Sequence, residues 1–180
     1  MAVIYQPEAD SYLLQKVLKK QLPKFLKKNP ELQFLEIGAG SGIQLQTALE
    51  AGVKKKNIFS CDLNPKVIQH CKKLGFNCVK SNLLKNIKGK FDVIVFNPPY
   101  LPYDKKEPRT SRMSTTGGET GSETINEFLK QVRKHLKANG IIFLLSSSLS
   151  KKIDFSDYKK KRVAKEKFFF EELYVWRLKE

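Results

Sequence analysis

The sequence has few of the residues that build metal sites and disulfide frameworks. Its 180 residues include two histidines, far apart in the chain, and three cysteines, Cys61, Cys71 and Cys78. Three is an odd number, and no two of these cysteines have the spacing of a zinc knuckle. We therefore expect no metal site, and we expect buried thiols in a reducing cytoplasm.

Long apolar runs are also missing. No run is long enough to cross a bilayer, and residues 1–7 lack the pattern of a signal peptide. Apolar residues make up 41% of the chain and charged residues 29%, which is typical of a globular protein rather than a disordered one. The length suits one domain over 1–180 with a substantial core, beginning with a helical segment over 1–30, and no membrane partner is expected.

Acidic residues are scarce. The 18 Asp and Glu are outnumbered by 34 Lys and Arg, which gives a formal net charge of +16. Such a charge favours an acidic partner such as RNA, or a protein that works on the ribosome. The lysines are spread over every segment, however, and lysine-rich surfaces also serve solubility and thermal stability. Charge therefore allows an RNA partner without requiring one.

The most informative stretch is 91–100. Its apolar run Val93-Ile94-Val95-Phe96 is typical of a strand buried on both faces. The strand then stops at Asn97-Pro98-Pro99-Tyr100, because prolines cannot donate ladder hydrogen bonds and Pro98 holds Asn97 in extended backbone. The result is a stiff corner with one amide side chain and one aromatic ring. It suits a site that grips a planar, hydrogen-bonding group, although a plain proline turn would give the same pattern.

A glycine-rich loop upstream favours a ligand site over a plain proline turn. A strand over 33–37 leads directly into Gly38-Ala39-Gly40-Ser41-Gly42, and a helix over 43–51 follows. Glycines let the backbone turn tightly and approach a ligand, while the helix N-terminus offers free N–H groups. Asp62 ends the next strand, twenty positions after Gly42 (62 − 42). An acid at about this distance binds ribose hydroxyls in nucleotide-binding βαβ units.

Periodicity and turn residues predict the remaining elements. Helices are predicted over 7–28, capped by Asp10 or Ser11 and kinked or split at Pro23, after the Asn64-Pro65 cap, and over 125–136, stopped by Asn139-Gly140. Strands are predicted over 76–79 and 141–145. A basic patch over 159–162 is followed by strands over 163–169 and 172–178, which would pair as a hairpin. The segment Leu101–Gly121 has no apolar period and is predicted to be a polar loop holding Arg109 and Arg112. Loops of this length tend to be functional.

These residues together resemble a known family. The chain is similar to class I S-adenosylmethionine-dependent methyltransferases. More narrowly, it resembles the HemK-like branch of archaea and eukaryotes, which methylates N5 of the glutamine in the Gly-Gly-Gln motif of class I release factors. The resemblance rests on segments 5–14, 36–42, 62–64, 81–84, 97–100 and 169–175. It implies an α/β, Rossmann-like fold with a seven-stranded, mostly parallel sheet of order 3-2-1-4-5-7-6, an antiparallel C-terminal hairpin, and helices on both faces.

The resemblance also implies a role for particular residues. S-adenosylmethionine would be the cofactor, bound by Ser11, Glu36, Gly38, Gly40, Gly42, Asp62, Leu63, Asn82, Leu83 and Asn97. The substrate amide would be bound by Asn97, Pro98, Pro99 and Tyr100. Of these four, the catalytic residues would be Asn97, Pro98 and Tyr100.

Three departures from the family pattern stand out. The family has Glu where this chain has Ala9, with an acid shifted to Glu8, and it has Asp where this chain has Asn82. The carbonyl of Asn82 still accepts a hydrogen bond from an adenine amino group, so we expect weaker binding rather than none. The segment 146–162 is too short and polar for the usual helix, which would leave one face of the sheet poorly covered there.

We expect the enzyme to catalyse methyl transfer mainly by positioning the substrate amide nitrogen. A carboxamide nitrogen is a poor nucleophile, and the Asn97 oxygen and Pro98 carbonyl would accept its hydrogens and orient it. General-base chemistry is not evident, because the corner shows no acid.

The main alternative function is that of an N-methyltransferase of adenine or guanine amino groups in RNA or DNA, which the positive charge favours. A non-catalytic subunit of the same fold is a third alternative, against which the intact Asn97, Asp62 and glycines argue.

The resemblance finally suggests a partner and a lid. In the implied sheet order the third strand, 76–79, lies at an edge, and exposed edges invite another chain. The resembled branch works with a small zinc-binding activator subunit, which we predict would pair there, although a short edge can also simply be tolerated. The 101–121 segment would be a mobile substrate loop.

Overall fold

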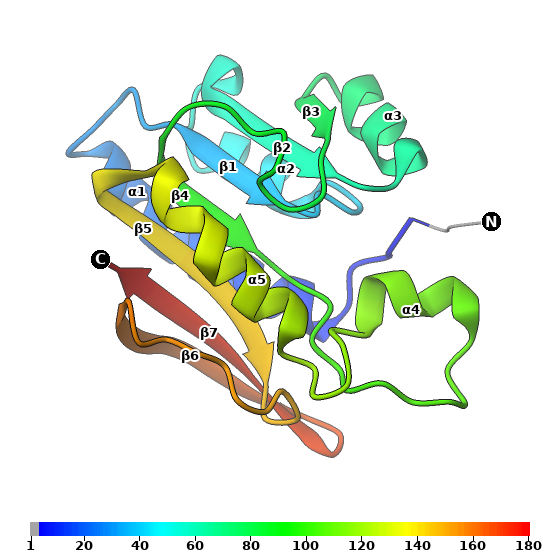
Figure 1. The fold of residues 1–180 in the computed structure, drawn as a ribbon. Helices are drawn as coiled ribbons and strands as arrows, with labels where there is room; N and C mark the ends of the chain where they lie inside the picture. Colours follow the sequence, from blue (N-terminus) through cyan, green and yellow to red (C-terminus); the bar gives the residue numbers. More distant parts are fainter. Residues whose placement is uncertain (1–3) are drawn as a thin grey trace.

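The computed structural model describes residues 4–180, without the side chain of Arg109. Figure 1 shows a twisted sheet with helices on both faces. The elements are α1 (Ala9–Leu26), β1 (Phe34–Ile37), α2 (Ile43–Glu50), η1 (Lys55–Asn57), β2 (Ile58–Asp62), α3 (Pro65–Lys73), β3 (Asn77–Lys80), β4 (Phe91–Phe96), α4 (Arg109–Thr115), α5 (Glu123–Val132), η2 (Arg133–His135), β5 (Leu136–Ser147), β6 (Lys159–Phe168) and β7 (Glu171–Lys179). None of the helices in this described part of the chain is long and apolar enough to cross a membrane.

The sheet has seven strands in the order β3-β2-β1-β4-β5-β7-β6. Strands β3, β2, β1, β4 and β5 pair in parallel, whereas β7 runs antiparallel to both β5 and β6. The predicted order and the C-terminal hairpin are both confirmed. The connections cross over at β1, so the gap between β1 and β4 is the switch point at which sheets of this kind bind ligands.

Side chains of the central strands alternate between two cores. In β4, Val93 and Val95 join the cluster under α1, α2 and α3, while Ile94 and Phe96 join the cluster under α5. Helices therefore cover both faces (Figure 1), which explains why the strand is a continuous apolar run.

Helix α1 continues through Pro23 to Leu26, so the prediction that Pro23 splits it is wrong. The proline removes one hydrogen bond, but its neighbours are well packed. Leu22 is fully buried, and the ring of Phe25 lies 6.2 Å from that of Phe143 in β5. The N-cap residue is Glu8 rather than the predicted Asp10 or Ser11, and the Glu8 side chain makes no cap hydrogen bond; Asp10 accepts instead from the Ser11 N–H within the first turn.

The prediction of a helix through Leu136, stopped at Asn139-Gly140, is wrong. Helix α5 ends at Val132, and Leu136 already pairs with Phe91 at the start of β5. The register then jumps over residues 137–140, which form a bulge. A Cβ at Gly140 would lie 2.6 Å from the Leu136 side chain, so the bulge needs glycine. The buried Leu136 fits either a helical or a sheet position, which is why its spacing misled the prediction.

The basic residues 159–162 do not precede the last hairpin but form the first half of its edge strand, β6. Exposed lysines on an edge strand discourage pairing with another chain. The segment 148–158, which is described throughout, contains no helix, as predicted. Phe155 and Tyr158 pack on the sheet there instead, and the Tyr158 hydroxyl donates to the Leu129 carbonyl at 2.6 Å.

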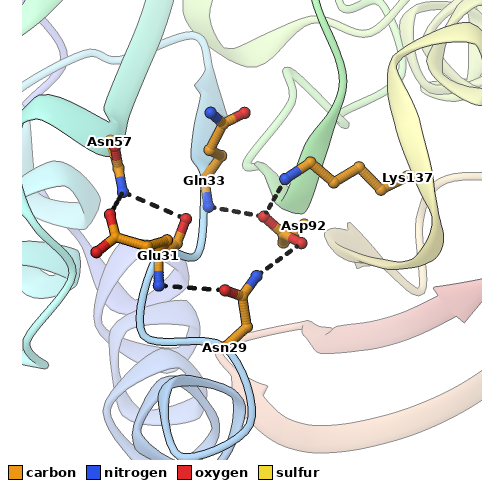
Figure 2. A network of polar contacts seen from close by, with 6 residues as sticks. All are labelled: Asn29, Glu31, Gln33, Asn57, Asp92 and Lys137. Carbon is orange, nitrogen blue, oxygen red and sulfur yellow. Dashed lines mark hydrogen bonds and ion pairs between the residues drawn. The ribbon is translucent and has the colours of Figure 1, made fainter.

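Asp92 ties together the amino-terminal end of the sheet (Figure 2). Its carboxylate accepts from the Asn29 amide at 3.1 Å and from the Gln33 backbone N–H at 2.8 Å, and it pairs with Lys137 of the β5 bulge at 2.7 Å. Glu31 extends the network by accepting from Asn57. This network lies at the end of β4 opposite to Asn97 and has a structural role.

Candidate active site

A cavity of about 550 Å3 lies at the carboxyl ends of β1, β2 and β4, at the switch point of the sheet. The structure brings most of the predicted site residues together in its wall. Those that line it are Ser11, Glu36, Gly38, Gly40, Asp62, Leu63, Asn82, Leu83, Asn97, Pro98 and Pro99. Gly42 and Tyr100 were predicted for the site but do not line the cavity.

Asn97 stands at the end of β4 with its two amide atoms in different situations. Its Nδ2 donates to Asp10 Oδ2 at 3.0 Å. Its Oδ1 is buried and has no hydrogen-bond partner among the described residues. An acceptor that neither protein nor solvent satisfies is costly, so this atom points to a donor supplied by a ligand.

Asp10 is a site residue that sequence reasoning missed, and the prediction that the corner lacks an acid is wrong. The carboxylate is 4% exposed and lines the cavity beside Asn97. It also accepts from the Tyr5 hydroxyl at 3.1–3.2 Å and from the Ser11 backbone N–H at 2.5 Å. Asp10 stands within the 5–14 segment that carries the resemblance, but its contact with Asn97 spans 87 positions and leaves no local pattern.

Glu36, the last residue but one of β1, lies in the cavity wall. Its side chain is 3% exposed, and Oε2 has no partner among the described residues. Burial, and secondly the charge of Asp62, raise the pKa of Glu36 well above that of an ordinary glutamic acid. Gln44 of α2, which was not predicted, has a similar free acceptor: its Nε2 donates to the Ser11 carbonyl at 2.9 Å, while its buried Oε1 has no described partner.

The glycine loop is fixed by the end of β2. Gly38 and Gly40 have φ angles of 69° and 50°, which favour glycine. The Gly38 N–H donates to the Cys61 carbonyl at 2.9 Å, and the Gly40 N–H donates to Asp62 Oδ2 at 3.3 Å. Asp62 Oδ1 accepts from the Asn64 N–H at 2.8 Å, and burial raises the pKa of Asp62. Asp62 therefore holds the loop in shape while it lines the cavity.

Apolar side chains flank the mouth of the cavity. Leu63, beside Asp62, is 46% exposed, and Leu83, on the loop after β3, lines the same cavity. Leu83 has a φ of 50°, an uncommon conformation that costs energy and that is found at ligand sites. Asn82 next to it is exposed. Two exposed or half-exposed leucines facing one cavity suit a flat aromatic ligand.

The two predicted residues outside the cavity have other surroundings. Gly42 is the N-cap of α2 at φ 81°, where a Cβ would lie 3.2 Å from Leu74. Tyr100 packs against both apolar cores. Burial, followed by the charges of Asp10 and Glu171, raises the pKa of Tyr100 above its usual value. The Tyr100 side chain thus packs against the two cores rather than forming part of the cavity wall.

The prediction that 101–121 is a polar loop throughout is wrong, because residues 109–115 form helix α4. Polar contacts replace the missing apolar face. Glu107 accepts hydrogen bonds from the hydroxyls of Ser111, Thr115 and Thr116, and the Arg112 guanidinium lies 4.9 Å from the Tyr103 ring centre. Helix α4 stands off the sheet beside the N-terminal segment (Figure 1), and its residues Thr110, Met113 and Ser114 complete the cavity wall.

The ends of this segment are packed onto the Asn-Pro-Pro-Tyr backbone. A Cβ at Gly117 would lie 2.6 Å from the Pro99 carbonyl oxygen, and one at Gly121 would lie 2.4 Å from that of Tyr100. Both positions therefore need glycine. Both glycines follow α4, so these close contacts fix where the chain returns to the corner after the helix.

Replacing Glu36 by glutamine should raise stability at neutral pH while weakening ligand binding. Below about pH 4.5 the carboxyl is protonated in both the folded and the unfolded chain. Between that pH and its raised pKa, only the unfolded chain ionises, so stability is lost as pH rises. Each increase of about 1 kcal/mol in the free energy of unfolding corresponds to an increase of about 2–4 °C in Tm. The measurement is Tm of both proteins from about pH 5 to about pH 8. A Tm difference that did not grow with pH would count against a neutral buried Glu36.

Comparison with known proteins agrees with this geometry. The sheet order and the site at its switch point define the class I methyltransferase fold. The chain belongs to the methyltransferase small domain family, whose model matches residues 11–161. It is 34% identical over 192 residues to a putative protein N5-glutamine methyltransferase of Methanocaldococcus jannaschii, with 97% of this chain and 92% of the relative covered. It is 28% identical to methyltransferase HEMK2 of Mus musculus, with 79% and 71% covered.

A solved structure shows the same fold. The structure of the E. cuniculi Mtq2-Trm112 complex, responsible for methylation of the translation termination factor eRF1, matches with a TM-score of 0.72. The identity is 24%, and 98% of each chain is covered. The family model and the M. jannaschii relative, rather than this shared fold, show that the chain is a methyltransferase.

Proposed function

We propose that this enzyme transfers a methyl group from S-adenosylmethionine to the side-chain amide nitrogen of a glutamine, the one in the Gly-Gly-Gln motif of a class I release factor. One observation carries the proposal: Asn97 presents a buried, unsatisfied acceptor at the cavity while its own N–H is taken by Asp10. A planar NH2 group is the ligand that this acceptor suits.

The cavity fits S-adenosylmethionine. Its groups would meet matching partners: the ammonium would meet the free Glu36 Oε2, the ribose hydroxyls would meet Asp62, and the adenine would pass between Leu63 and Leu83. Asn82 would accept from the adenine amino group. Gly38 and Gly40 leave room for close backbone approach. These assignments rest on the donor and acceptor pattern of the wall and on the family of the chain.

Asn97 and its neighbours would do the chemical work by positioning. The bound cofactor supplies an electrophilic methyl group on sulfur. Asn97 Oδ1 and the Pro98 carbonyl would accept the two amide hydrogens of the substrate and hold its nitrogen toward that methyl. Both acceptors would also stabilise the positive charge that develops on the nitrogen as the methyl–sulfur bond breaks, because they interact more strongly with the transition state than with the neutral amide. The cofactor would be left as a neutral thioether, and the methylated nitrogen would release one proton to solvent.

The rival substrate is an exocyclic amino group of adenine or guanine in RNA, which the charge of +16 favours. The corner accepts any planar amino group, so geometry at Asn97 does not separate the two. Transfer of radiolabelled methyl groups does: we expect label in release factor, none in release factor whose motif glutamine is replaced, and none in rRNA. Label in rRNA would establish the rival, and no label in either would favour a non-catalytic role.

The β3 edge is the proposed docking site of a small zinc-binding activator subunit. Strand β3 is the last strand on its side of the sheet, and Leu74 and Val79 near it are 43% and 39% exposed. An unpaired strand edge beside apolar side chains suits pairing with another chain. The E. cuniculi relative was solved in complex with a second protein, Trm112, which supports a partner of this kind. All three cysteines are buried and free, as predicted for the thiols themselves.

Replacing Val79 by lysine should weaken that complex by about tenfold or more, because a charge would enter an apolar contact. Coexpression of the activator with each variant, followed by affinity pull-down and calorimetry, measures the effect. Lys161→Ala, on the opposite sheet edge in β6, is the matched control and should bind normally. Equal binding by the Val79 and Lys161 variants would move the partner away from β3.

A further inference from the structure

Asp10 holds a buried carboxylate with an unusual set of neighbours. Its oxygens accept from Tyr5, Ser11 and Asn97, so both are engaged by protein donors. No lysine, arginine or histidine in the described part of the chain forms an ion pair with it. A buried carboxylate is costly, and hydrogen bonds from these three donor groups offset that cost here.

A role in starting α1 explains only part of this arrangement. Asp10 lies in the first turn of the helix and accepts from the Ser11 backbone N–H there. This contact is local, whereas the contact with Asn97 joins the start of α1 to the end of β4 across 87 positions. The carboxylate therefore serves the corner as well as the first turn of the helix.

The chemistry of the two groups fixes which way the Asn97 amide faces. A primary amide has a donor end and an acceptor end, and rotation by half a turn exchanges them. An ionised carboxylate only accepts, so it must face Nδ2, and Oδ1 then points elsewhere without a partner. Tyr5 supports this state: burial, then the charge of Asp10, raises the pKa of Tyr5 above its usual value, so its hydroxyl remains a donor.

We propose that Asp10 is a positioning residue for methyl transfer: it locks the Asn97 amide with Oδ1 toward the substrate amino group and increases the negative charge on that oxygen. Hydrogen bonds in a chain polarise one another, so donation from Nδ2 to a carboxylate strengthens Oδ1 as an acceptor. The inference rests on the proposed function for the identity of the substrate. It requires only that the substrate presents a planar amino group.

The first test is Asp10→Asn. Asparagine has nearly the shape of aspartate, but it has a donor end of its own, so it no longer dictates the orientation of Asn97. We expect kcat to fall by about 10–100-fold, the size typical of a lost charge-assisted interaction, with KM for S-adenosylmethionine and Tm nearly unchanged. Glu8→Gln is the matched control, since Glu8 is exposed, lies outside the cavity wall and is close by; its kcat should be normal. Unchanged kcat in folded Asp10→Asn would overturn the proposal.

The second test exchanges the pair. Asn97→Asp alone places two carboxylates at hydrogen-bonding distance, where they must share a proton. In the double variant Asp10→Asn with Asn97→Asp, the amide at position 10 donates to the new carboxylate, whose second oxygen again faces the substrate. We expect the double variant to be at least about tenfold faster than Asn97→Asp alone, which is a sign of coupling between the two sites. A merely structural Asp10 predicts that the two losses multiply, and that result would refute the positioning role.

These tests remain separate from the proposed function. If wild-type enzyme labels RNA instead of release factor, the kcat of the same variants is measured on RNA. The positioning role then stands or falls on that substrate, while the assignment of glutamine has already failed.

Discussion

Asn97→Ala is expected to bind S-adenosylmethionine normally and to lose methyl transfer by about 10²–10³-fold. Among the described residues, three buried side-chain acceptors have no partner, and the substitution removes the one at the Asn-Pro-Pro-Tyr corner while it leaves the glycine loop intact. The loss corresponds to about 2–4 kcal/mol of transition-state stabilisation, the effect of removing one preorganised group from an active site. Single-turnover rates with saturating cofactor measure it.

The competing interpretation is that Asn97 only shapes the turn before Pro98. In that case the variant would lose Tm and cofactor binding together, and its activity per folded molecule would be normal. Asn29→Ala is the matched control, because its amide also hydrogen-bonds an aspartate of β4, Asp92 at the amino-terminal end of the strand (Figure 2). The control should lose stability without losing activity per folded molecule. Full activity of folded Asn97→Ala would overturn the catalytic assignment.

Asp62→Ala should weaken S-adenosylmethionine binding by about 10²-fold or more. The carboxylate is expected to accept from ribose hydroxyls, and hydrogen bonds to charged groups contribute about 1.5–3 kcal/mol each. It also holds the Gly40 N–H at 3.3 Å, so its loss loosens the loop that the cofactor would contact. Both effects act in the same direction on the dissociation constant, which titration calorimetry measures.

Asp92→Ala gives the matched comparison for this prediction. Asp92 also stands at a strand end and accepts from a backbone N–H, but it lies in the network at the amino-terminal end of the sheet (Figure 2). We expect a lower Tm for this control and an unchanged dissociation constant. If Asp62→Ala bound the cofactor as tightly as the wild type, the ribose assignment would be wrong.

Local signals predicted the nucleotide-binding half of the fold well. The glycine loop after β1 and the acid after β2 follow from residues that are close in sequence, and they line one cavity in the structure. The sheet order came from the family resemblance, since strand neighbours such as β1 and β4 are not encoded in any local pattern.

What could not be predicted depends on contacts between distant or polar residues. The Asp10–Asn97 pair needs the start of α1 to meet the end of β4, and an aspartate near a helix start is ordinary in sequence. Helix α4 has no apolar periodicity that would predict it, since hydrogen bonds from its hydroxyl groups to Glu107 stabilise it instead. Leu136 continued a helical spacing, yet the pairing with Phe91 placed it in the sheet.

The most direct test of the proposed activity is to locate the transferred methyl group. Release factor is incubated with S-adenosylmethionine and with either wild-type enzyme or Asn97→Ala, and its peptides are then sequenced by mass spectrometry. The account predicts one added methyl on the glutamine of the Gly-Gly-Gln motif with the wild type, and at least about tenfold less with the variant in the same time. A methyl group at another residue, or equal methylation by both enzymes, would contradict it.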